Sequence, residues 1–253
     1  MTDTSPSIAP LLIIGAGLAG WTTVREFRKL DTTTPVVLVT ADSGDFYAKP
    51  TLSNAYAQKR APAQLVSTPA AKMAETLNVT LLAHHQMQSL DTAAQTALVS
   101  HNGETQTLRY SQLVLATGAH PIRIPVAGSA AGQVKSINNL DDFAVFHQAL
   151  GLDPSAAEQA TPATVVIMGA GLIGCEFAND LVQAGVTVHV VDPSPRPLAL
   201  LLPADASEQL QTALQAQGVV WHFGTTVTAV DEAGNGVRVQ LADGSGVEAQ
   251  MVL

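Results

Sequence analysis

The stretch that decides the fold is Ile13-Ile14-Gly15-Ala16-Gly17-Leu18-Ala19-Gly20, which continues the apolar run begun by Leu11 and Leu12. An apolar run that ends in Gly-x-Gly-x-x-Gly predicts a strand, a tight turn and a helix that bind the pyrophosphate of a dinucleotide. The three positions need glycine because the turn, the phosphate and the helix packing each leave no room for a Cβ atom. The helix predicted over residues 18–30 would present its first N–H groups to the anion.

A second apolar run over residues 35–39 completes a βαβ unit, and Asp42 follows it. An acidic residue about twenty positions after the glycines commonly accepts hydrogen bonds from ribose hydroxyls. A solvated loop residue beside Ser43 and Gly44 is the alternative for Asp42. The expected cofactor-binding residues of this first unit are Gly15, Gly17, Leu18, Ala19, Gly20 and Asp42.

The same pattern recurs after the apolar run 165–168, where Gly169-Ala170-Gly171-Leu172-Ile173-Gly174 opens a helix and residues 186–191 form the next strand. Asp192 ends that strand and favours NADH, because it would repel a 2′-phosphate, whereas Arg196 could reverse this preference. Two dinucleotide sites in one chain indicate two different dinucleotides, and FAD with NADH is the useful chemical pairing. The expected binding residues of this second unit are Gly169, Gly171, Leu172, Ile173, Gly174 and Asp192.

Each unit is followed by an antiparallel tail, with hairpin turns expected at Asn102-Gly103 and Asp243-Gly244. A final apolar strand follows each tail, at residues 112–115 and 250–253. We therefore expect an α/β chain with two Rossmann-like units, each carrying an antiparallel β-meander. Between the units we expect a helix over residues 140–150 that packs on the second unit and a polar loop over residues 151–162.

Composition excludes several other classes of protein. The chain has 253 residues, 47% of them hydrophobic, and a net charge of -9, which disfavours a nucleic-acid binder. No window reaches the roughly 20 apolar residues that span a bilayer, and the seven histidines show no metal-ligand spacing. With Cys175 as the only cysteine, no internal disulfide can form, which fits a cytoplasmic location. Arg25, Arg28 and Lys29 form a basic helix edge that either steers an acidic partner or complements the helix dipole.

Four segments together carry a resemblance to the FAD-dependent pyridine nucleotide-disulfide oxidoreductases. They are residues 13–20, Tyr47-Ala48-Lys49-Pro50-Thr51-Leu52-Ser53, Ala116-Thr117-Gly118, and the run from Gly169 to Leu181. The resemblance covers nearly the whole chain, and the last segment is similar to the rubredoxin reductases within that family. It implies an FAD-binding domain over residues 1–118 and an NAD(P)-binding domain over residues 119–253. Relative to the family, we expect the chain to be truncated, without the second FAD segment and the C-terminal interface domain.

The resemblance also implies roles for individual residues. Lys49 and Pro50 would approach the isoalloxazine, Ala116, Thr117 and Gly118 would line the flavin site, and Glu176 would lie near the nicotinamide and flavin. Lys49 and Glu176 are therefore the candidate catalytic residues. Lys49 would favour the anionic reduced flavin, and Glu176 could pair with it until the nicotinamide arrives. An exposed loop charge is the alternative for Lys49, and a first-turn residue favoured by the helix dipole is the alternative for Glu176.

No cysteine precedes Cys175, so the dithiol relay of the disulfide-reducing relatives is excluded. Cys175 itself is expected to be a small buried packing residue. The resemblance then implies an enzyme that takes hydride from NADH and passes single electrons from FAD to rubredoxin or another small iron-sulfur carrier. Two alternatives remain open: a ferredoxin- or nitrite-reductase-type flavoprotein, and a non-catalytic dinucleotide-binding fragment.

Overall fold

The computed structural model describes residues 9–151 and 163–253, so the loop expected over residues 151–162 lies outside it apart from Gly151. The described chain divides into two compact units. Unit 1 is formed by residues up to Ala48 together with Val66–His120, and unit 2 by Lys49–Leu65 together with Pro121–Leu253. Residues 49–65 lie in sequence between the two segments of unit 1 but belong to unit 2. The expected assignment of residues 1–118 to FAD and 119–253 to NAD(P) concerns function and stays a prediction.

Unit 1 is built on a four-stranded parallel sheet. Its strand order is β3-β2-β1-β7, with β1 paired to both β2 and β7. The glycine turn leads from β1 into α1, a helix over Leu18–Leu30, as the sequence predicts. The strands are β1 (Leu11–Ile14), β2 (Val36–Val39), β3 (Thr80–Leu82) and β7 (Gln112–Leu115).

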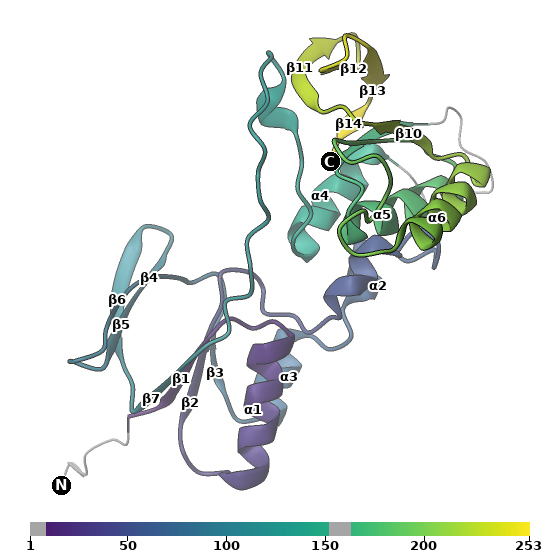
Figure 1. Cartoon of the computed structure of the whole chain (residues 1–253). Coiled ribbons are helices and arrows are strands. Elements are labelled where there is room, and N and C mark those ends of the chain that lie inside the picture. Colours follow the sequence, from purple (N-terminus) through teal and green to yellow (C-terminus); the bar gives the residue numbers. More distant parts are fainter. Residues whose placement is uncertain (1–8, 152–162) are drawn as a thin grey trace, which may run out of the picture. The chain divides into compact units, whose positions relative to one another are not determined.

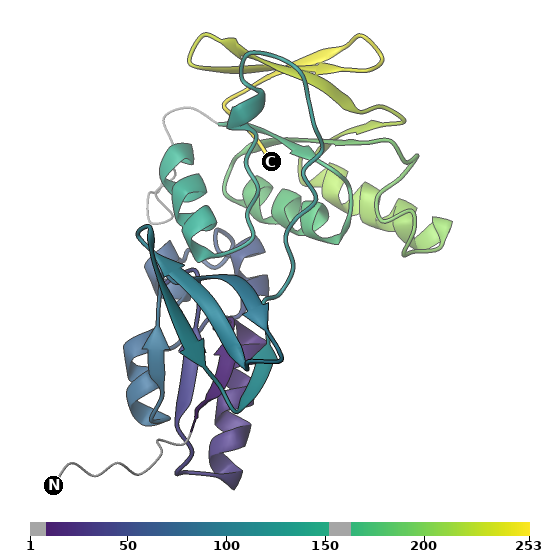
Figure 2. The ribbon, with the colours of Figure 1, turned by 90° about the vertical axis from the view of Figure 1, so that its left-hand side faces the viewer.

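Two layers cover this sheet, one on each face (Figures 1 and 2). Ile13 packs with Trp21 and Val24 of α1, and with Met73 of α3 (Ala70–Thr76), on the helical face. The alternating residue Leu12 packs with Val99 and its neighbours on the other face, under an antiparallel sheet. That sheet has the order β4-β5-β6, over Gln86–Asp91, Thr96–His101 and Glu104–Arg109. Its β5-β6 turn places Asn102 at φ 50° and Gly103 at φ 84°, which confirms the expected hairpin.

Unit 2 repeats this architecture with the strand order β10-β9-β8-β14 and a meander of order β11-β12-β13. Val166 and Val252 pack against the meander, whereas the opposite face of the parallel sheet carries α5 and α6 (Figure 2). Gly244, at φ 86°, closes the second expected hairpin. The two matching units confirm the α/β fold class. The elements are β8 (Thr164–Met168), α5 (Leu172–Gln183), β9 (Thr187–Asp192), α6 (Ala204–Ala216), β10 (Val220–Phe223), β11 (Val227–Ala233), β12 (Gly236–Leu241), β13 (Gly246–Ala249) and β14 (Met251–Val252).

The remaining helices of unit 2 come from the segment 49–65 and from the connection between the units. Residues 49–65 form η1 (Lys49–Ser53) and α2 (Pro62–Leu65), which contact α4 and α5. The helix expected over residues 140–150 is α4 (Leu140–Leu150); Asn139 and Asp142 form a capping box at its start. Phe146 is fully buried and contacts Phe177 of α5 edge-to-face at 6.5 Å, so α4 packs on unit 2 as predicted. A short η2 (Ala131–Gln133) precedes it.

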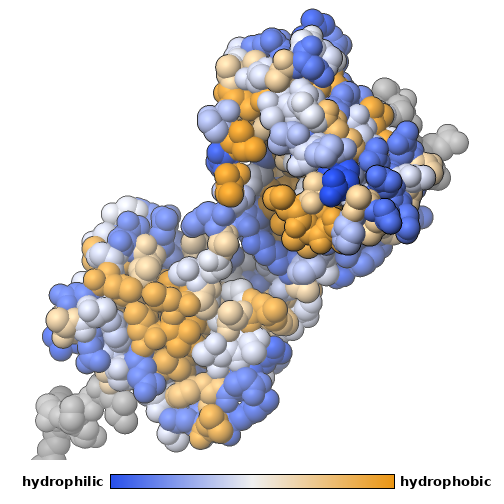
Figure 3. Space-filling view, in the orientation of Figure 1, coloured by the Kyte–Doolittle hydropathy of each residue, from blue (hydrophilic) through white to orange (hydrophobic). Residues whose placement is uncertain are grey.

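The surface of each unit mixes apolar and hydrophilic side chains on the face shown in Figure 3. Several large apolar side chains are exposed, among them Leu18 at 64%, Leu172 at 56% and Ile173 at 63%, which directly follow the two glycine turns. None of the helices in the described part of the chain is long and apolar enough to cross a membrane.

Candidate dinucleotide sites

The first glycine turn is held by contacts that exclude a side chain. A Cβ atom on Gly20 would lie 1.8 Å from the carbonyl oxygen of Gly15, so α1 packs directly on the turn. A Cβ atom on Gly15, which has φ 107°, would lie 2.2 Å from the carbonyl oxygen of Ala116. The Ala116 N–H donates to Ile14 O at 2.7 Å. The structure therefore places the expected residues Ala116 and Thr117 against the turn in unit 1.

Gly17 differs from Gly15 and Gly20 because no described residue fills the space beside its Cα atom. No heavy atom lies within 4 Å of the position that its Cβ would take, and its φ of -69° is one that any residue can adopt. Gly17 is the N-cap of α1, and no side chain caps the helix there. Among the described residues, no side chain therefore occupies the N-terminal end of α1, where its first N–H groups could bind an anion.

The second turn repeats this arrangement, except that no described atom lies within 4 Å of the position that a Cβ on Gly169 would take. Gly169 has φ 110°, and a Cβ on Gly174 would lie 2.0 Å from the Gly169 carbonyl oxygen. Gly171 is the N-cap of α5 without a side-chain cap, at φ -74°, and no heavy atom lies within 4 Å of its Cβ position. Both turns therefore combine a closed glycine that packs the helix with an open glycine at the helix N-terminus.

Asp42 lies in the loop after β2, where its carboxylate contacts its own loop. Its Oδ1 accepts hydrogen bonds from Thr40 Oγ1 at 2.6 Å and from the Gly44 N–H at 3.0 Å. Trp21, fully buried on α1, donates from Nε1 to Gly44 O at 2.8 Å and fixes the same loop. A carboxylate can accept more than these two hydrogen bonds, so Asp42 could also accept from ribose hydroxyl groups, and this role stays a prediction.

Asp192 ends β9 and contacts the second glycine turn directly. Its Oδ2 accepts from the Ala170 N–H and its Oδ1 from the Ser194 N–H, both at 2.7 Å. The carboxylate is therefore held at the edge of the turn, where a ribose is expected. Leu198, in the loop after Asp192, also donates its N–H to Ala170 O at 2.9 Å. Arg196 lies in the same loop, and its buried Nε has no hydrogen-bond partner among residues 9–151 and 163–253.

The two candidate catalytic residues lie in unit 2, but the structure gives them different partners. Lys49 Nζ donates to Asn138 Oδ1 at 2.5 Å, and Glu176 Oε2 accepts from Ser53 Oγ at 2.7 Å. The expected Lys49–Glu176 pair is not among the ion pairs of residues 9–151 and 163–253. Those pairs are Lys29–Glu26, Lys72–Glu75 and Arg238–Glu248. The physical reason is that each side chain has a neutral hydrogen-bond partner from another segment: Asn138 for Lys49 and Ser53 for Glu176.

Sequence reasoning missed three residues of this region: Ser53, Asn138 and Asp180. Ser53 and Asp180 lie within the motifs quoted above, and Ser53 Oγ donates to the carbonyl oxygen of Pro50 at 3.2 Å. Asp180 is fully buried on the inward side of α5, beside Phe177 and Leu181. An acidic residue in that apolar face was the available signal, because an ionised carboxylate is buried only with hydrogen-bond donors around it.

Cys175 follows Gly174 on α5, and its surroundings make its thiol unreactive. Cys175 is 6% exposed, and its Sγ donates to Ala170 O at 3.5 Å. Burial, reinforced by the nearby Asp192 and Glu176, raises the pKa of Cys175 to about 11. The thiolate that a redox reaction needs is therefore scarce at neutral pH.

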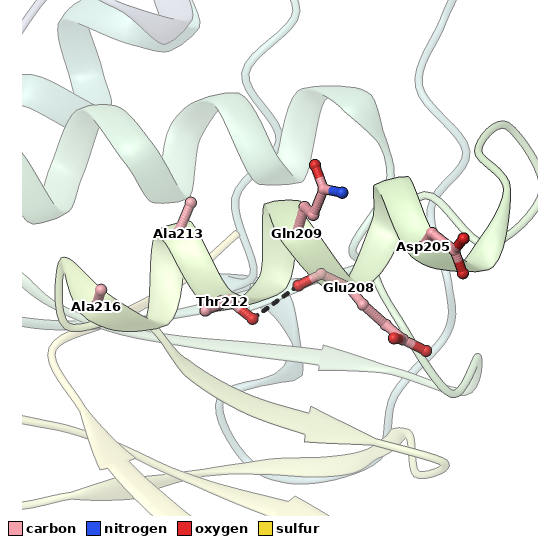
Figure 4. A pocket seen from close by; sticks show the side chains of 6 residues that line it. All are labelled: Asp205, Glu208, Gln209, Thr212, Ala213 and Ala216. Carbon is pink, nitrogen blue, oxygen red and sulfur yellow. Dashed lines mark hydrogen bonds between the residues drawn. The ribbon is translucent and has the colours of Figure 1, made fainter.

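A shallow hollow lies on the exposed side of α6 (Figure 4). Figure 4 shows the carboxylates of Asp205 and Glu208 pointing away from the helix, and Thr212 Oγ1 donating to Glu208 O at 2.8 Å. No residue of a glycine turn lines it, so we assign it no role. The residues that line the hollow are Asp205, Glu208, Gln209, Thr212, Ala213 and Ala216.

No group of three or more His, Cys, Asp or Glu that could hold a metal occurs in the described parts of the chain.

Comparison with known proteins agrees with this geometry. The rubredoxin-NAD(+) reductase of Alcanivorax borkumensis is 42% identical over 245 residues, and that of Acinetobacter baylyi is 39% identical over 246 residues. Each match covers 96% of this chain but only 61% of the relative. The covalent putidaredoxin reductase–putidaredoxin complex contains a chain with 25% identity and a TM-score of 0.82, over 96% of this chain and 57% of that one. Residues 9–253 match the family described as pyridine nucleotide-disulphide oxidoreductase, and the chain belongs to that family.

Proposed function

We propose that this chain is the dinucleotide-binding part of an NADH-dependent flavoprotein oxidoreductase that transfers electrons to rubredoxin or a similar small iron-sulfur carrier. The observation that carries the proposal is the pair of glycine turns, each with an open position at an uncapped helix N-terminus. Two such turns provide sites for two pyrophosphates, as FAD and NADH together require. The chain spans 61% of the length of the two rubredoxin reductases compared above.

The two cofactors are assigned to the two units. Unit 1 would bind FAD, with the pyrophosphate at Gly15, Gly17 and Gly20 and Asp42 at the ribose, and Ala116, Thr117 and Gly118 would line the flavin site. Unit 2 would bind NADH at Gly169, Gly171 and Gly174, with Asp192 at the adenosine ribose. The flavin, when bound, accepts the hydride as an electron pair and releases the electrons singly.

Lys49 and Glu176 would contact the reacting groups from unit 2. Their hydrogen-bond partners, Asn138 and Ser53 respectively, are neutral, and neither residue belongs to an ion pair within the described part of the chain. Lys49 would favour negative charge on the reduced flavin, and Glu176 would orient the nicotinamide. Stopped-flow measurement of flavin reduction in Lys49→Met and Glu176→Gln tests these roles, and unchanged rates in both variants would contradict them.

NADH is proposed over NADPH because Asp192 is fixed beside the glycine turn by two backbone N–H groups. A 2′-phosphate at the ribose would meet this carboxylate and be repelled. Arg196 is the residue that could offset the repulsion. Titrating both nucleotides against wild type and Arg196→Ala measures each contribution, and tighter NADPH binding in wild type would overturn the preference.

Rubredoxin is proposed as acceptor because both curated relatives carry that activity in their names. The complex of putidaredoxin reductase with putidaredoxin supports a small carrier protein more generally. A ferredoxin is the alternative acceptor.

A single cysteine with a buried thiol fits the proposed cytoplasmic location, where structural disulfides are rare.

The decisive experiment is anaerobic reduction of the FAD-loaded protein. A yellow protein that NADH bleaches, and that added oxidised rubredoxin restores, would support the proposal. Recovery of colour with ferredoxin but not with rubredoxin would reassign the acceptor. A protein that binds NADH but stays colourless after incubation with FAD would instead support a non-catalytic binding fragment.

A further inference from the structure

Asp180 is a buried acidic residue to which the proposed reaction gives no role. It is fully buried on α5, one helical turn after Glu176. Its Oδ1 accepts from the Ala57 N–H at 2.7 Å and its Oδ2 from the Tyr56 N–H at 3.1 Å. Burial raises the pKa of Asp180, while these backbone donors oppose the shift. A carboxylate held by backbone N–H groups in this way fixes a segment of chain in place.

The segment that Asp180 holds is the one that carries Ser53 and Lys49. Ser53 lies three residues before Tyr56, and its Oγ donates to Glu176 Oε2. The Tyr56 ring stacks on the His147 ring of α4, with 5.4 Å between the ring centroids and an interplanar angle of 8°. Helix α5 therefore contacts the segment twice, through Asp180 at residues 56 and 57 and through Glu176 at residue 53.

We propose that Asp180 is a positioning residue, which holds residues 55–57 on α5 and thereby sets the place of Ser53 and the orientation of the Glu176 carboxylate. The inference rests on the proposed function in one respect, that Glu176 contacts the nicotinamide. Both contacts to α5 lie within unit 2, so the effect of Asp180 on Glu176 passes through only a few residues of chain. Without the hydrogen bonds from residues 56 and 57, Ser53 would move relative to α5 and Glu176 would lose its fixed partner.

Asp180→Asn is the sharpest variant, because asparagine has nearly the same shape but only one acceptor oxygen. Its amide NH2 group would face one of the two backbone donors, which cannot bond to it. Amide hydrogen exchange on the apo protein reads this change without any cofactor. We expect the Tyr56 and Ala57 amides to exchange about ten-fold faster or more, while those of β8 and β9 are unchanged.

Val239→Ala is the matched control, since Val239 is fully buried in the meander of the same unit, in a core cluster that includes no residue of the segment 49–65. It is expected to lower unit 2 stability without selective exposure of residues 55–57. Trypsin cleavage is a second measurement, because Lys59 and Arg60 lie two and three residues after Ala57. Cleavage after them should increase in Asp180→Asn only. Uniformly faster exchange across unit 2 in Asp180→Asn would overturn the proposal in favour of general destabilisation.

A double-mutant cycle with Ser53→Ala then tests the path to Glu176. We expect either single substitution to slow flavin reduction about ten-fold with less than a two-fold change in the dissociation constant of NADH, and the double variant to be no slower than either. Additive losses, or losses confined to NADH affinity, would contradict the positioning role. If wild type itself fails to reduce flavin, the proposed function is wrong, whereas the exchange of Tyr56 and Ala57 still decides whether Asp180 holds the segment.

Discussion

Gly17 and Gly20 belong to one motif, yet they are glycines for different reasons. A Cβ on Gly20 would meet the Gly15 backbone at 1.8 Å, and one on Gly174 would meet Gly169 at 2.0 Å. Backbone cannot yield cheaply, so Gly20→Ala and Gly174→Ala should each lower the free energy of unfolding by about 3 kcal/mol. Urea unfolding followed by circular dichroism measures this. A loss below about 0.5 kcal/mol would show that the helices can shift away from the turns.

Gly17→Ala and Gly171→Ala should behave in the opposite way. Both positions have ordinary φ values and open space, so the protein should fold with unchanged stability. The new methyl group would instead occupy the space that a pyrophosphate needs, weakening FAD or NADH binding by about 1.4 kcal/mol, or ten-fold, at least. Calorimetric titration checks the affinity. Gly132→Ala is the control, since Gly132 also has open space but lies outside both turns.

Cys175 should react slowly with alkylating reagents and with a characteristic pH dependence. With a pKa of about 11, about one thiol in a thousand is ionised at pH 8, and the fraction rises ten-fold per pH unit until the pKa is reached. Iodoacetamide labelling followed by mass spectrometry should therefore accelerate between pH 8 and pH 10. A labelling rate that levels off near pH 8.5, as for a free cysteine, would refute the raised pKa.

For single residues, the sequence predicts the close backbone contacts at the glycine turns, because the glycine motif itself marks positions where a Cβ cannot fit. It does not predict hydrogen-bond partners that arrive from distant segments. Lys49 and Glu176 were expected to pair, but Asn138 and Ser53 take their places. Asp180 was visible only as an acidic residue in an apolar helix face, and the backbone of residues 56 and 57 that satisfies it is more than a hundred positions away.

The end of α1 shows how one side chain can join several elements. Arg28 is part of the basic helix edge that was a candidate surface for steering an acidic partner, but its guanidinium donates hydrogen bonds to backbone carbonyl groups of unit 1. It donates to Leu77 O and Asn78 O before β3, and to Thr34 O and Asp31 O before β2. These bonds join the C-terminal end of α1 to two loops.

Arg28→Lys should therefore destabilise unit 1 although it keeps the charge, because an ammonium group cannot reach carbonyls on both sides. We expect a loss of about 2 kcal/mol in the free energy of unfolding, from charged hydrogen bonds to carbonyl groups. Lys29→Ala is the control, since its pair with Glu26 is exposed and contributes less than about 1 kcal/mol. Equal stability of Arg28→Lys and wild type in urea would contradict this account.

The longer helices and the hairpin turns could be predicted from the sequence, whereas the shortest strand, the short helices and the grouping of segments into units could not. The helix over residues 18–30, the helix over residues 140–150 and both hairpin turns follow from local patterns of apolar residues and glycines. Strand β3 has only three residues, and the short helices α2 and α3 lack a periodic apolar face long enough to detect. The grouping of residues 49–65 with unit 2 depends on tertiary packing and leaves no local pattern.

For the whole chain, the two cofactors should protect different amides from hydrogen exchange. FAD should protect residues 15–20 and 116–118 of unit 1, and NADH residues 169–176 of unit 2, since each ligand stabilises only the unit it binds. A ligand at a hundred times its dissociation constant adds about 2.7 kcal/mol of stability to that unit. Protection of the same turn by both ligands would reject the assignment. NADPH should protect residues 169–176 less than NADH at equal concentration.

The crossing of residues 49–65 into unit 2 also fixes an order of events during synthesis on the ribosome. The chain leaves unit 1 at Ala48 and returns at Val66, yet the helices that receive the crossing segment, α4 and α5, begin only at Leu140 and Leu172. Unit 1 can complete its sheet once β7 has emerged, whereas residues 49–65 must wait for more than fifty further residues before Asp180 becomes available. Nascent chains arrested before residue 180 should therefore stay sensitive to trypsin at Lys59 and Arg60, and chains that extend to residue 253 should lose that sensitivity.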